Sequence, residues 1–179
     1  MDAAERLFIK NGIAATSVDE IVAAADVSKG TFYHYFESKE HMLAALQERF
    51  IASMAERFQT AMSHYRTDDW ASRLRSWVST GINSYLDRVA LHDVVFHEYR
   101  AQDRKLRNEN AIVTSLADFL HRGAQSAAWT IDDPRLTAIV LFSALHAAVD
   151  DAVILSDKID RKKLVRALER IFERIVGVT

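Results

Sequence analysis

The sequence predicts an all-α protein, and three observations lead to this prediction. Its 179 residues contain five glycines and one proline, so few positions interrupt a helical backbone. Apolar residues make up 49% of the chain, and they recur every three or four residues, which is the period of one helix face. The sequence has no long alternating pattern of the kind that marks β-strands.

The first two predicted helices are short and have clear end signals. Residues 3–8 form an apolar stripe of two alanines, a leucine and a phenylalanine, and Gly12 follows as a stop. Either Thr16 or Ser17 caps the second helix. Glu20 lies three residues after Ser17, which is the spacing of a capping box.

The third predicted helix, after Ser28, has two unlike faces. Ser28 is a favourable N-cap, and Ser38 is a second one only ten residues later. Phe32 and Phe36 share one face, while Tyr35 is assigned a mainly structural role. So short a helix is unstable alone in water, so the two phenylalanines must anchor it in a core. The remaining residues then form a polar tip, which is typical of a recognition helix in a DNA major groove: Lys29, Thr31, Tyr33 and His34.

The rest of the chain continues as helices, for a total of about nine. Asp132 or Asp133 caps a helix that has Pro134 in its first turn, a favoured place for proline. Gly177 ends the last helix. The helical spacing predicts these further segments: 38–65, 70–89, 91–100, 104–128, 133–155 and 160–176.

The last two predicted helices indicate a homodimer. Residues 136–155 are apolar on most sides, so we expect a helix that is buried all round. In a monomer, one face of this helix or of the last helix would remain uncovered. Pairing with a two-fold copy covers both, although the same residues also suit the core of a single chain. The predicted interface comprises Leu141, Ala144, Leu145, Ala148, Leu168, Ile171, Phe172 and Ile175.

Composition indicates a cytoplasmic protein that does not enter a membrane. The chain has no cysteine, which excludes disulfides and thiolate zinc sites. No secretory signal is evident, and we see no apolar run near the roughly 18 residues of a membrane span. Net charge is −2, and the first 47 residues hold four basic and seven acidic groups. This balance disfavours general binding to nucleic acid.

A long gapless motif resembles the N-terminal DNA-binding domain of the TetR/AcrR family of bacterial transcription regulators. The resemblance covers residues 3–46, about a quarter of the chain. Its segments are Ala3–Phe8, Gly12, Thr16–Ile21, Ala25–Phe36, Ser38–Glu40 and Leu43. The resemblance implies a DNA-binding domain over residues 1–46 and an effector-binding and dimerisation domain over residues 47–179.

What the resemblance implies for function is a repressor that binds a palindromic operator in double-stranded DNA as a homodimer. The motif carries the family's DNA contacts onto Thr16, Ser17, Ser28, Lys29, Gly30, Thr31, Tyr33, His34 and Lys39. Family members usually have a basic stretch before the first helix. Met1 starts inside the pattern here, so we expect weaker DNA binding than in a relative that has such an arm.

The resemblance also implies a small-molecule effector in the C-terminal domain. Aromatic and polar side chains on facing helices would suit an aromatic or apolar compound, although ordinary core packing explains them equally. The candidates are Trp77, Tyr85, Phe96, His97, Phe119, His121, Trp129, Phe142 and His146.

Histidines and carboxylates raise the possibility of a metal site, which the spacing does not support. His146 and Asp150 lie four residues apart on one face, and His92, His97 and Glu98 cluster upstream. Neither Glu-x-x-His nor His-Glu-x-x-His occurs, so we expect a polar role for His146 and Asp150, with no metal and no cofactor. No nucleophile motif or phosphate loop suggests an enzyme. Two alternatives stay open: a regulator without a ligand or controlled by a partner protein, and a helical metal- or ligand-binding protein that has lost DNA binding.

Overall fold

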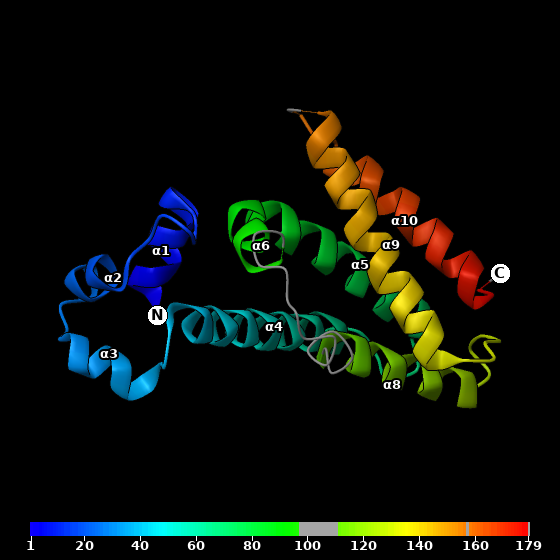
Figure 1. Cartoon of the computed structure of the whole chain (residues 1–179). Helices are drawn as coiled ribbons and strands as arrows, with labels where there is room; N and C mark the ends of the chain where they lie inside the picture. Colours follow the sequence, from blue (N-terminus) through cyan, green and yellow to red (C-terminus); the bar gives the residue numbers. More distant parts are fainter. Residues whose placement is uncertain (97–110, 157, 179) are drawn as a thin grey trace. The chain divides into compact units, whose positions relative to one another are not determined.

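The computed structural model describes residues 1–96, 111–156 and 158–178, and these residues form nine α-helices (Figure 1). The all-α prediction is confirmed. The helices are α1 (Asp2–Asn11), α2 (Val18–Ala25), α3 (Lys29–Tyr35), α4 (Lys39–Ser63), α5 (Trp70–Asp87), α6 (Val89–Phe96), α8 (Ala111–Gln125), α9 (Pro134–Leu155) and α10 (Arg161–Val176).

The helices divide into two compact units. Among the described residues, unit 1 comprises 1–52 and 88–96, and unit 2 comprises 53–87 and the residues from 111 onward. Helix α4 therefore contributes its first half to unit 1 and its second half to unit 2. The domain boundary predicted after residue 46 concerns function, and it stays a prediction.

The ends of the first two helices follow from local chemistry. Gly12 ends α1 at φ 80°, a left-handed value that suits glycine, and its N–H donates to the carbonyl of Phe8 at 2.9 Å. Ser17, and not Thr16, caps α2. Its hydroxyl accepts from the Glu20 N–H at 3.2 Å, while the Glu20 carboxylate accepts from the Ser17 N–H at 2.7 Å. The predicted capping box is confirmed.

Unit 1 is held by a small apolar core and by ion pairs between its helices. The core consists of Ala4, Phe8, Ile21, Val22, Phe32, Met42, Leu43, Leu46 and Val94, so helices α1 to α4 and α6 all contribute. Arg49 on α4 binds Asp2 and Glu5 on α1, each at 2.6 Å. Arg88 approaches Glu5 at 3.4 Å. The pairs of Arg49 fix α1 against α4, and the contact of Arg88 joins α1 to the start of α6.

Helix ends in unit 2 also match the sequence signals. Asp133 caps α9, with its carboxylate accepting from the Leu136 N–H at 2.9 Å. Asp160 caps α10 in the same way, and Gly177 ends that helix in the left-handed region at φ 81°. Asp133, and not Asp132, is therefore the cap of α9, and the predicted end of the last helix at Gly177 is confirmed.

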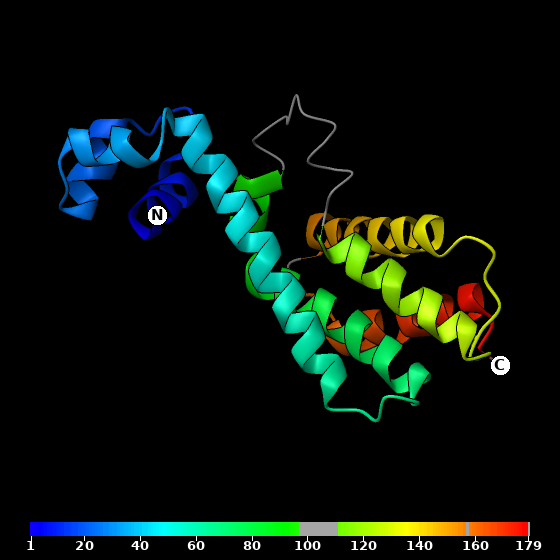
Figure 2. The same ribbon diagram turned by 90° about the horizontal axis from the view of Figure 1, so that it is seen from below.

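The core of unit 2 is closely packed. Helix α8 runs beside α9 and α5 beside α10, as Figure 2 shows. The rings of Phe58 and Trp77 stack with centroids 4.9 Å apart. Gly123 lies against Trp129 so closely that an added Cβ would be 2.0 Å from the indole. Packing at this density leaves little empty space around these aromatics.

Helix α9 is buried on one side only, so the expectation that it is buried all round was wrong for the single chain. Its buried residues are Ala138, Leu141, Leu145 and Val149. Large apolar side chains on its other sides are exposed, namely Leu136, Ile139, Val140, Ile154 and Leu155. By length and composition alone this helix could also cross a membrane, contrary to our expectation of no such run. The difference arises because a long span tolerates a few polar residues within it.

Several predicted boundaries shift by a few residues. Helix α5 ends at Asp87 and α6 begins at Val89, whereas the spacing had placed these points at 89 and 91. Parts of the helices predicted over 91–100 and 104–128 fall at residues 97–110, which lie outside the described residues.

Candidate nucleic-acid interface

Helices α2 and α3 form a helix-turn-helix. The turn depends on Asp26, which adopts left-handed backbone at φ 53°, and on the Val27 N–H, which donates to the Val22 carbonyl at 3.1 Å. Aspartate tolerates this conformation better than most side chains. The turn therefore directs the chain from α2 into α3 within three residues.

The seven-residue α3 is anchored by aromatic rings, as the sequence predicted. Phe32 is 4% exposed and belongs to the core of unit 1. Phe36 ends the helix as its C-cap residue, is half-buried, and lies 5.7 Å from Phe32 between ring centroids. The anchored side fixes which residues α3 presents outward.

The outer side of α3 is polar and exposed. Every residue from Ser28 to Thr31 is exposed, as are Tyr33 and His34. Tyr33 is 53% exposed although it is a large aromatic residue. Hydroxyl, ammonium and imidazole groups are therefore available on one short helix, in the combination that contacts phosphates and base edges.

Tyr35 belongs to this exposed surface, and its mainly structural assignment is corrected. It is 67% exposed, and its ring meets His34 edge to face with centroids 5.0 Å apart. The helical spacing from Phe32 and Phe36 leaves residue 35 beside the anchored face, which is why the pattern alone did not decide it.

Ser28 organises the start of α3. Its hydroxyl accepts from the Thr31 N–H at 3.0 Å and shares a hydrogen bond of 2.9 Å with the Thr31 hydroxyl. The cap fixes the backbone at the point where the helix begins. Both hydroxyls remain exposed, so they keep the capacity to meet a phosphate.

Gly30 has open space on its outer side. A Cβ added there would meet Ser28 Oγ at 3.6 Å, an ordinary contact distance. The fold of the single chain therefore does not require glycine at this position. A close approach by another molecule would require it.

Lys29 is held by a carboxylate of the preceding helix. Its ammonium lies 2.7 and 3.0 Å from the two oxygens of Asp19. The hydrogen bond and charge of Asp19 raise the pKa of Lys29. Both side chains are more than half exposed, so the pair is weak and a phosphate can compete for the lysine.

Two of the predicted DNA contacts have structural roles instead. Thr16 is 1% exposed, and its hydroxyl donates to the Gly12 carbonyl at 2.8 Å, so its side chain cannot reach DNA. The Lys39 ammonium donates to the carbonyls of Ile13 at 2.6 Å and Thr16 at 2.9 Å. Lys39 therefore secures the loop between α1 and α2. Ser17 is exposed but engaged in its capping box.

Four of the nine residues predicted to line an effector cavity lie in the core of unit 2. Trp77, Tyr85, Phe119 and Trp129 are at most 5% exposed and pack on one another or on neighbouring helices. Helical periodicity shows that such residues face inward, but it does not distinguish a filled core from a cavity. Their contacts assign these four to the core.

The other predicted effector residues are scattered. Phe142 and His146 are half-buried neighbours on α9, and His121 is exposed. The side chain of Phe96 and all of His97 lie outside the described residues.

His146 and Asp150 bind groups that the sequence did not indicate. Nδ1 of His146 lies 2.9 Å from the Phe142 carbonyl. The carboxylate of Asp150 accepts a hydrogen bond from the Tyr85 hydroxyl on α5. These contacts fit the expected polar role. Among the described residues, no group of three histidines or carboxylates is placed to hold a metal ion.

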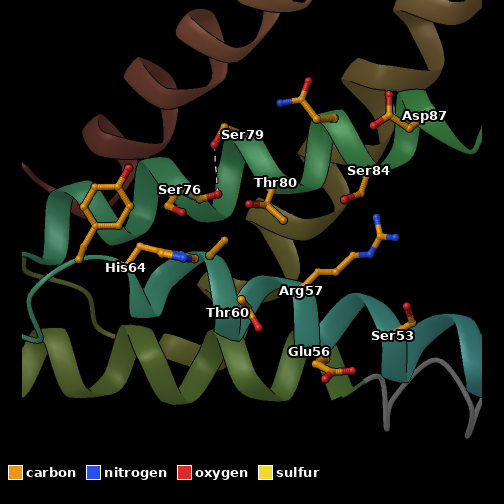
Figure 3. Close-up of a pocket in the computed structure, with 13 residues that line it drawn as sticks. Ser53, Glu56, Arg57, Thr60, His64, Ser76, Ser79, Thr80, Ser84 and Asp87 are labelled. Carbon is orange, nitrogen blue, oxygen red and sulfur yellow. Dashed lines mark hydrogen bonds between the residues drawn. The ribbon is translucent and has the colours of Figure 1, made fainter.

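A polar groove lies between the second half of α4 and α5, and Figure 3 shows the side chains that line it. Its volume is about 730 Å³. The lining repeats every three or four residues on both helices: Ser53, Glu56, Arg57, Thr60, Ala61, His64 and Tyr65, then Ser76, Ser79, Thr80, Asn83, Ser84 and Asp87. None of the predicted effector residues lies in this groove. The stripe of small hydroxyl residues on α5, namely Ser76, Ser79, Thr80 and Ser84, was the signal that could have revealed it.

The predicted dimer residues fall into two groups. Leu141, Leu145, Leu168 and Phe172 are at most 5% exposed, so contacts within the chain assign them to the core and not to an interface. Ile171 and Ile175 are 47% and 42% exposed, and Ala144 and Ala148 are half-buried.

Comparison with known proteins identifies the family that the helix-turn-helix segment resembles. Residues 1–46 match the model of the bacterial regulatory proteins of the tetR family. The resemblance predicted from the sequence is confirmed: residues 1–46 are similar to the DNA-binding domain of this family.

Relatives and solved structures agree with this result. The HTH-type transcriptional repressor KstR2 of Rhodococcus jostii is 31% identical over 103 residues, 58% of this chain. The HTH-type transcriptional regulator EthR of Mycobacterium tuberculosis is 34% identical over 92 residues, 51% of this chain. The matched part spans 41% of each relative's length. The transcriptional regulator FadR of Bacillus subtilis, solved with stearoyl-CoA, is 25% identical with a TM-score of 0.80, covering 96% of this chain and 94% of FadR.

Proposed function

We propose that this protein is a TetR-type transcription regulator that binds a palindromic operator through α3 in the major groove. The observation that carries the proposal is α3 itself, a short helix fixed by Phe32 and Phe36. It presents the exposed residues Ser28, Lys29, Gly30 and Thr31 at its start. The relatives support it, since they are repressors or regulators of the same type. We propose that the protein represses transcription. We also propose that it acts in the cytoplasm, and that it acts by binding DNA and not as an enzyme.

A mobility-shift experiment with the DNA that flanks the protein's own gene tests this proposal. The parent protein should shift a short palindromic segment, and Tyr33→Ala should abolish the shift. Tyr65→Ala is the matched control, because it removes another exposed tyrosine from unit 2, 43% exposed against 53% for Tyr33. A shift by Tyr33→Ala as strong as that of the parent would refute our placement of α3. Failure of the parent to bind would favour the alternative of a helical ligand-binding protein.

We propose that the protein acts as a homodimer, because a two-fold operator requires two recognition helices. The exposed apolar residues of α9 and α10 support a second copy as the occupant of this surface. They include Ile139, Val140, Ile171 and Ile175. Only Ala138, Leu141, Leu145 and Val149 of α9 are buried within the chain, and its exposed apolar residues include Leu136, Ile139 and Val140.

We propose that an effector binds in unit 2 and that the groove between α4 and α5 holds its polar part. Ligand sites combine a concave surface with a few oriented polar groups, and this groove supplies hydroxyls, Asn83, His64 and Arg57. A ligand that holds the second half of α4 would act on a helix whose first half belongs to unit 1. Unequal affinity for two states of α4 would then change DNA binding.

Similarity to FadR makes stearoyl-CoA the first compound to test, since it joins an apolar chain to a polar, charged head. We expect stearoyl-CoA to release the operator in the mobility-shift experiment, and free CoA or stearate alone to do so less. Arg57→Gln should weaken the response while leaving operator binding intact. No response to any of the three compounds would favour a regulator with another effector or none.

A further inference from the structure

A second hollow lies in unit 2, where the turn from α4 enters α5 and the end of α8 approaches. Its volume is about 820 Å³, and it shares no lining residue with the α4–α5 groove. Its charged lining residues are Asp68, Asp69, Arg73 and Arg122, with Ser126 beside them. Two guanidinium groups therefore face one space.

Arg73 is fixed in position without an anionic partner. Its guanidinium carbon lies 5.3 Å from the centroid of the Trp70 ring and 5.2 Å from that of Phe119. One terminal nitrogen donates to the Thr67 carbonyl at 3.0 Å, whereas the buried Nε has no hydrogen-bond partner. The aromatic rings hold the planar group in place, so its orientation is set before any ligand arrives.

Arg122 places a second positive charge at the hollow, and among the described residues it has no ion-pair partner either. Its Nε donates to the Asp118 carbonyl at 3.3 Å, and within the described part of the chain neither arginine forms an ion pair. Burial lowers the pKa of Arg73, and the charge of Arg122 lowers it further. Two cations that face each other across a hollow repel, and an anion between them removes this repulsion.

The carboxylates of the hollow are already engaged. Asp68 binds Arg66 at 2.9 Å. Asp69 accepts from the Ser72 N–H at 3.0 Å, which caps the start of α5. Neither is placed against Arg73 closely enough to raise its pKa. The two arginines therefore lack a counter-ion from their own surroundings.

We propose that this hollow binds the oxyanion of a small molecule, a carboxylate or a phosphate, between Arg73 and Arg122. A planar guanidinium binds such groups strongly through its terminal N–H groups, and both arginines line the hollow. The Ser126 hydroxyl is available as a further donor. The site shares no residue with the DNA interface or with the effector groove, so its test does not depend on the proposed function.

Thermal unfolding of the full chain tests the site with inorganic phosphate and with acetate, against chloride at equal ionic strength. At about five times the dissociation constant, binding favours the folded state about sixfold, so the unfolding midpoint should rise by about 2–4 °C. A response to phosphate alone identifies a phosphate ligand, and a response to acetate as well shows that the site also accepts a carboxylate.

Arg122→Gln distinguishes binding from a structural role. In chloride it should unfold at a higher temperature than the parent, because the repulsion is gone, and phosphate should raise its midpoint no further. Lys162→Gln removes the same charge from an exposed position on α10 and should respond like the parent. Circular dichroism confirms the fold of each variant. Equal anion responses from the parent and Arg122→Gln, or no response from the parent to either anion, would overturn the proposal.

Discussion

Substitutions at some residues of the helix-turn-helix should affect DNA binding without affecting folding. Ser28 and Phe32 shape and anchor α3, so changes there disturb structure and contact together. Gly30 and Asp19 differ, because one has open space around it and the other forms only an exposed ion pair. These two positions therefore give the cleanest tests of the interface.

Gly30→Ala should leave the fold intact and weaken operator binding. The new Cβ meets Ser28 Oγ at an acceptable 3.6 Å, and alanine favours a helix over glycine by up to about 1 kcal/mol. Against DNA the same methyl group would separate the backbone from the groove, and we expect a loss of roughly tenfold or more in affinity, since poorly met contacts cost about 1–3 kcal/mol each. Thermal unfolding and a binding titration measure the two effects. Unchanged affinity would mean that the α3 backbone does not approach DNA.

Asp19→Asn should strengthen operator binding. The change removes a negative charge near the phosphates and frees Lys29 from its partner. We expect a gain of roughly three- to tenfold at low salt that shrinks as salt increases, because the interaction is between exposed charges. Asp68→Asn is the control, since it also breaks an exposed ion pair, here with Arg66, but lies in unit 2. Equal effects of the two variants would contradict this account of Lys29.

At the scale of single helices, the sequence predicted the features that depend on residues nearby in the chain, such as helix caps. Ser17, Asp133 and Gly177 were found at helix ends because caps act over three or four residues. Contacts between distant residues were not predictable in this way. Lys39 reaches carbonyls 23 and 26 residues earlier, and nothing in its local sequence marks that reach. For Trp77, the helical spacing of apolar residues predicted that the side chain faces inward. It did not predict that the ring of Phe58 stacks on it and fills the space beside it.

The contact between the start of α4 and the loop after α1 predicts a stability effect. Lys39→Met keeps the aliphatic stem but leaves the carbonyls of Ile13 and Thr16 without their donor. Hydrogen bonds to a charged group contribute about 1.5–3 kcal/mol each at most, so the free energy of unfolding should fall by about 1–3 kcal/mol. Urea unfolding measures it, with Lys10→Met on the exposed side of α1 as the control. A loss of DNA binding without any loss of stability would return Lys39 to the list of direct DNA contacts.

For the whole molecule, two properties would depend on a second copy of the chain. An operator with two half-sites needs two α3 helices, and the apolar surface of α9 and α10 needs a cover. A soluble monomer rarely leaves such a surface open. Dimerisation and DNA recognition should therefore fail together when this surface is charged.

The double variant Ile171→Glu, Ile175→Glu should convert a dimer into a monomer. Both side chains are nearly half exposed in the single chain, so glutamate there leaves the chain's own core undisturbed. In an interface each carboxylate would lose its water, at a cost of about 2 kcal/mol or more per residue. Light scattering after gel filtration reports the mass, and the mobility shift reports the coupled loss of operator binding. Ile9→Glu, which charges an exposed isoleucine in unit 1, should leave the mass unchanged. A dimeric double variant would exclude these two residues from the interface. A monomeric parent that still binds a full palindrome would show that DNA, and not this apolar surface, brings the two copies together.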